Sequence, residues 1–188
     1  MRRLALSALA ALALTSTVAR AQGASQPMAA GTDNLSGWLL VAPGSPAGVG
    51  LGARFMIPIV PEGLLRGQGI RIREELALEV GADYLHWGYH QSWGPYGNID
   101  WDVNALEIVA GGMWNWWVTP KVALYPKLDV GYRIAWLSGW DNTLWGTPGS
   151  YSELFINGAV GAIFKLQKVS FRIEAGNHAL RLGLGVKL

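Results

Sequence analysis

The last nine residues of the chain, Leu180–Leu188, constrain the fold more than any other stretch. Large apolar residues occupy every even position, and Arg, Gly or Lys occupies every odd position. Successive side chains of a β-strand point to opposite faces, so this alternation predicts a strand with one apolar face and one polar face. We interpret the stretch as the closing strand of a sheet that the rest of the chain builds.

The first 21 residues have the features of a secretory signal peptide. Arg2 and Arg3 precede an apolar segment, 4–14, made of Leu, Ala and one Ser, and residues 19–21 (Ala-Arg-Ala) match the small-x-small cleavage pattern. The apolar segment is too short to cross a bilayer, which takes about 20 apolar residues. The sequence therefore predicts three segments: a signal peptide (1–21), a flexible leader (22–35) and one folded domain (36–188).

Composition narrows the class of the exported domain. Cleavage removes three arginines, so the 15 Lys and Arg residues become 12, against 13 Asp and Glu. The mature chain thus has a net charge of −1, and the basic pI of the full chain is no argument for nucleic-acid binding. Without Cys, an exported domain cannot rely on disulfides. Ten Trp, 25 Gly and 51% apolar residues, without a long apolar run after the signal, favour alternating membrane strands over membrane helices.

Similar alternation recurs along the domain, and turn-forming residues separate the alternating segments. The predicted strands are 36–43, 48–60, 70–87, 102–118, 122–137, 151–166, 168–176 and 179–188. An even number of strands puts both ends of the domain on one side, which is periplasmic in bacterial single-chain membrane barrels. The long connections, 88–101 and 138–150, then lie outside. The sequence predicts an all-β fold, an eight-stranded antiparallel up-and-down transmembrane β-barrel.

The parity of the short turns supports this arrangement. Residues that flank a two-residue hairpin loop pair directly and must point to the same face. Leu166 and Val169 flank residues 167–168, and Ala175 and Leu180 share the apolar face across the turn at 177–178. Across the turn at 119–121, Val118 and Val122 also match. We therefore expect one continuous apolar face around the barrel.

The polar face of these strands carries seven acidic and seven basic residues. Eight strands leave a lumen just wide enough for side chains, so we expect these residues to pair there and to plug the lumen. The expected ion-pair network consists of Arg54, Glu75, Glu79, Asp83, Glu107, Lys127, Asp129, Arg133, Glu153, Lys165, Arg172, Glu174 and Arg181, and Lys187 lies on the same face. A soluble barrel could carry the same charges on its exterior.

Tryptophan residues cluster near the ends of the predicted strands. Aromatic side chains settle at both membrane interfaces, because the ring is apolar and the indole N–H needs a polar partner. The expected interface girdle consists of Trp87, Trp101 and Trp136 (with Trp140 and Trp145) at the outer ends, and of Trp114 and Trp116 (with Trp38 and Trp117) at the inner ends.

The end of the chain also resembles a known motif. Arg181-x-Gly183-x-x-Val186-x-Leu188 is similar to the C-terminal assembly signal of outer-membrane proteins, with Leu in place of the commoner Phe. The mature chain as a whole resembles the small eight-stranded outer-membrane barrels of the OmpA/OmpX type. The resemblance implies location in the bacterial outer membrane, contact with outer-membrane lipid, and insertion by the barrel-assembly machinery.

Within this class, the sequence favours a structural or surface-interaction role. The two long connections are rich in Gly, Trp and Tyr, which suits contact with lipid or an extracellular partner that the sequence does not identify. A narrow pore or a solute-binding barrel is the alternative, because inward charges could line a path. A soluble periplasmic barrel is a further possibility that the signal peptide alone does not exclude.

An outer-membrane lipid-modifying enzyme is a less favoured alternative. His90-Gln91-Ser92 resembles the His-x-Ser motif of barrel lipid A deacylases, in which a His activates a Ser. We expect this segment in a loop, with Glu107, the nearest strand acid, facing the lumen. Three scattered His residues (His86, His90 and His178) do not predict a metal site. No motif for a cofactor or for nucleic acid is present, so we predict no catalytic, cofactor or metal residues.

Overall fold

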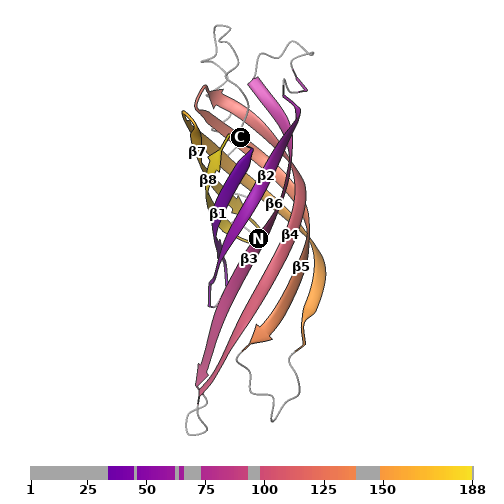
Figure 1. The fold of residues 1–188 in the computed structure, drawn as a ribbon, viewed down its shortest axis with the longest axis vertical. Helices are drawn as coiled ribbons and strands as arrows, with labels where there is room; N and C mark the ends of the chain where they lie inside the picture. Colours follow the sequence, from indigo (N-terminus) through magenta and orange to yellow (C-terminus); the bar gives the residue numbers. More distant parts are fainter. Residues whose placement is uncertain are drawn as a thin grey trace, which may run out of the picture.

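Eight strands follow one another along the chain and close into a barrel (Figure 1). Each strand pairs antiparallel with its neighbours in sequence, and β1 pairs with β8. The predicted fold class is therefore confirmed. The strands are β1 (Leu35–Ala42), β2 (Gly48–Val60), β3 (Arg73–Ser92), β4 (Asn98–Thr119), β5 (Val122–Ser138), β6 (Tyr151–Leu166), β7 (Val169–Gly176) and β8 (Leu180–Val186).

The computed structural model describes residues 34–44, 46–61, 64–65, 73–92, 98–138 and 149–187. The predicted signal peptide, the leader as far as residue 33, Trp140, Trp145 and Leu188 lie outside these residues. No helix in the described part of the chain is long and apolar enough to cross a membrane.

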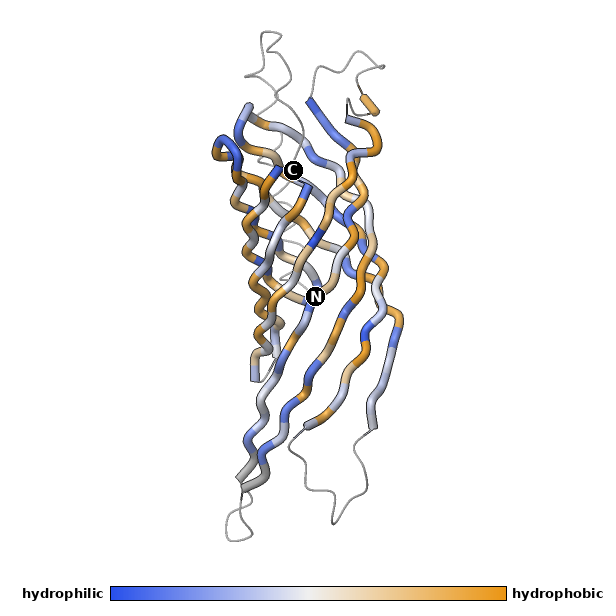
Figure 2. The backbone as a smooth tube through the Cα atoms, viewed as in Figure 1, coloured by the Kyte–Doolittle hydropathy of each residue, from blue (hydrophilic) through white to orange (hydrophobic). Residues whose placement is uncertain are grey.

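The alternation that predicts the strands also sorts their side chains between the two sides of the wall. In β8, Leu180, Leu182 and Leu184 point outward and remain 48–67% exposed, whereas Arg181 points inward and is 2% exposed. Figure 2 shows the same change between apolar and polar residues along the strands of the barrel. The apolar face is thus the exterior, and the charged face is the lumen.

Two of the three turns pair as their parity predicts. Leu166 pairs with Val169, and Ala175 pairs with Leu180. At the third turn, Val122 pairs with Thr119 rather than with Val118, and the register shifts between Trp117 and Thr119. Val118 and Val122 nevertheless have the same outward parity, since each is half-buried next to an inward, buried residue. The Thr119 hydroxyl accepts hydrogen bonds from the backbone N–H groups of Lys121 and of Val122, at 3.2 and 3.0 Å. This side-chain cap tightens the turn, and the bulge restores the apolar parity.

The hairpin of β3 and β4 differs most from the sequence-based boundaries. The sequence predicts a loop over 88–101. In the structure, Gly88–Ser92 belong to β3 and Asn98–Trp101 belong to β4, and the two strands pair as far as Ser92 and Asn98. Beyond the ends of β2 and β5 the two strands pair only with each other in the described part of the chain. The hairpin therefore projects past its neighbours at the lower end of Figure 1.

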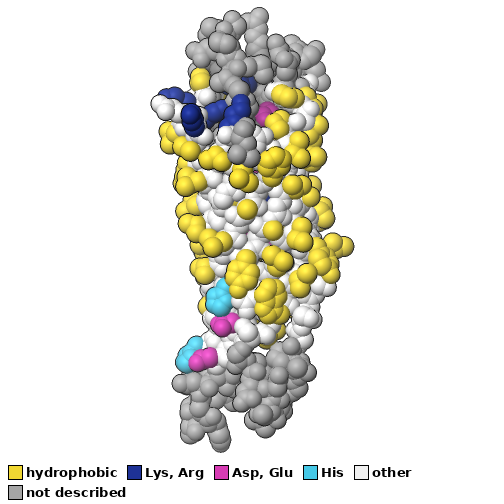
Figure 3. All heavy atoms as spheres, in the orientation of Figure 1, with side chains coloured by type: hydrophobic (Ala, Val, Ile, Leu, Met, Phe, Trp, Pro, Cys, Tyr) yellow, Lys and Arg dark blue, Asp and Glu magenta, His cyan; other side chains and the backbone are white. Residues whose placement is uncertain are grey.

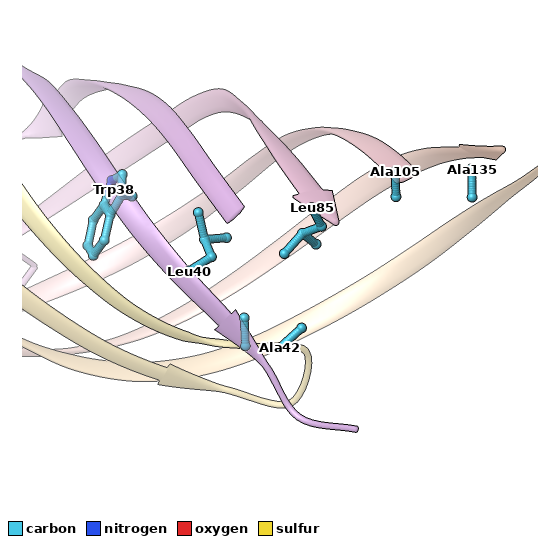
Figure 4. Close-up of a cluster of buried hydrophobic side chains, with 7 residues drawn as sticks. Trp38, Leu40, Ala42, Leu85, Ala105 and Ala135 are labelled. Atoms are coloured by element: carbon cyan, nitrogen blue, oxygen red, sulfur yellow. The ribbon is translucent and has the colours of Figure 1, made fainter. Parts of the chain in front are cut away.

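Buried side chains from all around the wall point into the lumen. Toward the end of the barrel with the β4–β5 and β6–β7 turns (the turn end), Met56, Met113, Trp117, Tyr125 and Ile163 pack together with two alanines. A second apolar cluster lies toward the end with the β3–β4 hairpin (the hairpin end), and Figure 4 shows its side chains pointing into the barrel. That cluster consists of Trp38, Leu40, Ala42, Leu85, Ala105, Ala135 and Ala179.

Candidate functional site

The charged side chains of the lumen form one large cluster, here called the central network. Glu79 is its hub: its carboxylate lies 2.5 Å from Lys127 Nζ, 3.0 Å from Arg172 Nη2 and 3.8 Å from Arg54 Nε. Each of these four side chains is at most 2% exposed. Three cations thus surround one carboxylate without water access, so each depends on its neighbours for charge balance.

Three more acids complete the charge balance of the central network. Glu174 binds Arg181 at 2.9 Å and Lys127 at 3.5 Å, and Asp83 binds Arg54 as well as Arg181, the latter at 3.4 Å. Asp129 lies 3.2 Å from Lys127 Nζ. The network therefore contains four carboxylates and four cations, contributed by β2, β3, β5, β7 and β8. Its formal charge is zero, which is the arrangement in which buried charges are tolerable.

Neutral polar side chains that the sequence analysis did not single out extend the central network. Tyr125 donates to Glu174 at 3.2 Å, and Asn157 donates to Asp129 at 3.2 Å. Ser36 accepts from Arg172 at 3.0 Å and from the Trp38 indole at 2.9 Å. These groups carry no charge, so only their inward parity could have pointed to them.

A separate cluster, here called the rim cluster, lies nearer the hairpin end. Arg133 binds the fully buried Glu107 at 2.6 Å and the half-exposed Glu153 at 2.7 Å. It also donates to His178 Nδ1 at 3.3 Å, and its guanidinium lies 5.1 Å from the ring centre of Phe155. The predicted set thus divides into two clusters rather than one continuous network.

Two other members of the predicted set, Glu75 and Lys165, lie nearer the turn end. Glu75 is buried opposite Asn115, and Lys165 Nζ lies 5.9 Å from the ring centre of Trp117 at the turn end. Lys187 follows β8 and is exposed. These positions lie closer to the turn end than the central network, so face parity alone did not predict which charges meet.

Glu74 is a buried carboxylate on the opposite, outward-parity face of β3. In the alternating pattern of β3, Glu74 interrupts the apolar face. Its side chain is 1% exposed and accepts hydrogen bonds from the Leu65 backbone N–H and from the Trp114 indole. The connection after β2 is thereby tied to the outer wall at the turn end.

The tryptophans of the expected girdle differ in orientation. Trp114 and Trp116 contact each other edge to face at the turn end, and Trp136 packs against Tyr84 on the exterior. Trp87 instead packs against the inner apolar cluster at the hairpin end. Trp101 shares that inner-face parity, because it pairs with Tyr89 and stacks on it with the planes 4° apart. Neither Trp87 nor Trp101 is therefore a lipid-facing girdle residue.

The projecting hairpin carries different chemistry on its two faces. The face that continues the lumen bears the Tyr89–Trp101 stack. The face that continues the lipid side bears His86, 3.8 Å from Asp102, and His90, hydrogen-bonded to Asp100. Figure 3 shows His and acidic side chains at the lower end of the face in view, below a band of apolar side chains. The outward face thus changes from apolar to polar where the hairpin leaves the barrel.

These observations define the class of protein. A closed eight-stranded barrel with a charged, filled interior and an apolar exterior is the architecture of a transmembrane β-barrel. The described residues contain no group of three or more His, Cys, Asp or Glu side chains that could hold a metal ion.

No protein-family model matches the chain, and no curated protein matches it in sequence. Among solved structures, the chain is similar to Ail, the attachment invasion locus protein of Yersinia pestis. The crystal structure of Ail with the heparin analogue sucrose octasulfate matches at 14% identity and a TM-score of 0.49, covering 81% of this chain and 94% of that chain. A structure of Ail in a phospholipid bilayer nanodisc matches at 11% identity and a TM-score of 0.43, covering 84% and 100%.

Proposed function

We propose that the protein is a bacterial outer-membrane barrel that interacts with its surroundings through the projecting β3–β4 hairpin. The observation that carries this proposal is the inverted polarity of the barrel. Leu128, Leu154, Ile156 and Leu184 are each more than 60% exposed on the exterior, while the central network is buried inside. A soluble barrel would leave this apolar band in water, which costs about 25 cal/mol for each Å².

Export and assembly are part of the same proposal. Residues 1–21 would direct secretion, and residues 22–34 would form the leader, which is one residue shorter than predicted because Leu35 begins β1. The assembly machinery would read Arg181, Gly183, Val186 and Leu188. Two of these residues also have structural partners, since Arg181 binds Glu174 and Gly183 lies against the Trp38 ring. Substitution of Arg181 or Gly183 would therefore affect the stability of the barrel as well as its recognition by the assembly machinery.

The membrane location is tested by cell fractionation combined with gel mobility. We expect the mature chain in the detergent-soluble outer-membrane fraction, with a folded band that migrates differently before and after boiling. Recovery from the periplasm without detergent would overturn the proposal.

The hairpin is suited to binding because its outer parts lack sheet neighbours. In the described pairing, β3 beyond His86 and β4 before Asp102 bind only each other, so their outer edges offer backbone groups to an extended partner. The Tyr89–Trp101 stack adds a rigid aromatic surface. A Tyr89→Ser/Trp101→Ser variant should fold and reach the cell surface but reduce adhesion of expressing cells to protein-coated surfaces. Unchanged adhesion would contradict this role.

A plugged lumen is part of the same proposal. Two apolar clusters lie along the lumen, with the central network between them. We expect planar bilayers containing the purified barrel to show no steady ion conductance above background. Steady conductance would favour the alternative, a narrow pore or a solute-binding barrel.

One observation keeps the enzyme alternative open. His90-Gln91-Ser92 lies at the end of β3 rather than in a loop, and His90 is hydrogen-bonded to Asp100, not to Glu107. A carboxylate that orients a His near a Ser is an arrangement used for nucleophilic catalysis. Both partners are mostly exposed, at 64% and 74%, whereas a catalytic pair gains from exclusion of water. Lipid A mass spectra from cells expressing wild type or Ser92→Ala decide, and identical spectra would remove the enzyme.

A further inference from the structure

We propose that the turn end of the barrel binds the headgroups of anionic phospholipids through three lysines, Lys121, Lys168 and Lys187, here called the lysine arc. This inference rests on the proposed membrane location. All three side chains belong to exposed residues at strand ends. Figure 3 shows Lys and Arg side chains gathered at the upper end of the face in view.

The three lysines occupy consecutive parts of the wall. Lys121 precedes β5, Lys168 lies in the turn between β6 and β7, and Lys187 follows β8. The Lys165 N–H donates to the Lys121 carbonyl at 2.7 Å, which ties the β4–β5 turn to β6. Val169 pairs with Val186, which brings the ends of β7 and β8 together. The arc therefore spans four adjacent strands, from β5 to β8.

The depth of the lysine arc matches the headgroup region. Each lysine is the neighbour in sequence of an outward apolar residue: Val122, Val169 or Val186. Val169 and Val186 are 44% and 38% exposed on the exterior. A lysine at this position can lay its apolar stem along the edge of the hydrocarbon layer and extend its ammonium group to the phosphates.

The charge distribution selects an anionic partner. Among the described acidic side chains, those that are not buried are Asp100, Asp102 and Glu153, and all three lie toward the hairpin end. The described acids at the turn end, Glu74 and Glu75, are buried. The lysine arc is therefore exposed at the turn end without an exposed described acid nearby, and each Lys at an anionic membrane surface strengthens binding about fivefold.

The test uses the mature barrel refolded into phosphatidylcholine vesicles. Spin-labelled phosphatidylglycerol or spin-labelled phosphatidylcholine is added, and the motionally restricted fraction gives the relative association constant of the two lipids. We expect wild type to prefer phosphatidylglycerol by about fivefold or more at low salt, the factor that one engaged lysine supplies. The preference should fall as ionic strength rises.

Three variants locate the effect. Lys121→Gln/Lys168→Gln/Lys187→Gln should bring the preference close to parity, while the matching triple Arg variant should keep it. Asp100→Asn/Asp102→Asn, which changes charge at the hairpin end, should leave it unchanged. Equal binding of both lipids by wild type, or full preference in the Gln variant, would overturn the inference. A wild-type chain that never acquires a heat-modifiable folded band in vesicles would instead contradict the proposed membrane location.

Discussion

At the scale of single residues, the lumen is packed by placing large inward side chains against glycines on the neighbouring strand. Gly52 pairs with Asp83, and Gly111 pairs with Asp129. At both glycines, a Cβ atom would overlap the carboxylate of the paired residue. Part of the high glycine content is therefore a consequence of charged side chains that cross a narrow lumen.

Gly111 and Gly112 provide a matched pair of substitutions. A Cβ at Gly111 would overlap Asp129, whereas a Cβ at Gly112, on the outward face, meets no atom within 4 Å. Gly111→Ala should lower the free energy of unfolding by about 1–3 kcal/mol, because it overpacks the lumen. Gly112→Ala should leave it unchanged or raise it by up to about 1 kcal/mol. Urea unfolding in detergent micelles measures both, and equal effects would contradict this packing.

Glu79 should be the most sensitive acid of the central network. Replacing its carboxylate with the neutral amide of Gln leaves Arg54, Lys127 and Arg172 with one partner fewer, so Glu79→Gln should cost about 3–5 kcal/mol of unfolding free energy. The control, Glu153→Gln, removes a half-exposed partner of Arg133, and should cost at most about 1 kcal/mol. The same urea titration compares them, and a Glu79→Gln barrel as stable as the control would contradict the central role of Glu79.

At the scale of elements, the β3–β4 hairpin has one part inside the sheet and one part outside it. Residues 73–86 of β3 have neighbours in both directions over most of their length, whereas Gly88–Ser92 pair only with β4 among the described residues. Amide hydrogen exchange of the barrel in nanodiscs should therefore be fast at 88–92 and 98–101 and slow at 76–86. Uniform protection along the whole hairpin would show that another segment covers it.

The comparison of β3 and β8 shows which boundaries the sequence could predict. Where a barrel strand lies in the membrane, its lipid-facing side must be apolar. β8 and most of β3 therefore follow a strict alternation that marks them as strands. Beyond His86 the outward side chains are polar and the inward side chains are aromatic. The sequence there has no apolar outward face, so its pattern resembles that of a loop. The burial of Glu74 was equally hidden, because its partners come from the connection after β2 (Leu65) and from the next strand (Trp114), and no local pattern brings these together.

For the charged side chains of the lumen, the sequence also predicts one property and not another. Inward parity predicted that Glu79 and Arg172 would face the lumen, since every second residue of their strands does. Parity does not give the height of a side chain along the barrel, which depends on the stagger of all eight strands. The separation of Arg133 from the central network therefore required the register of the closed barrel.

At the scale of the whole molecule, the two ends of the barrel differ in charge and in how far their strands extend. The hairpin end carries exposed Asp and His side chains, and the turn end carries the lysine arc. The intervening band is apolar on the outside and filled with ion pairs on the inside. We therefore expect the barrel to insert in one direction, with the hairpin outside the cell. Protease added to intact cells should cleave within 88–101 and leave the turns at 119–121 and 167–168 intact.

The most direct test of the membrane barrel is the environment of its outward side chains. The chain contains no Cys, so single spin labels can be placed at Leu128, Ile156 and Leu182 on the exterior. In bilayers we expect oxygen, which dissolves in lipid, to relax these labels strongly, and a water-soluble nickel chelate to relax them weakly. Labels at all three positions that respond to the nickel chelate and not to oxygen would show that this face is in water, and would contradict a transmembrane barrel.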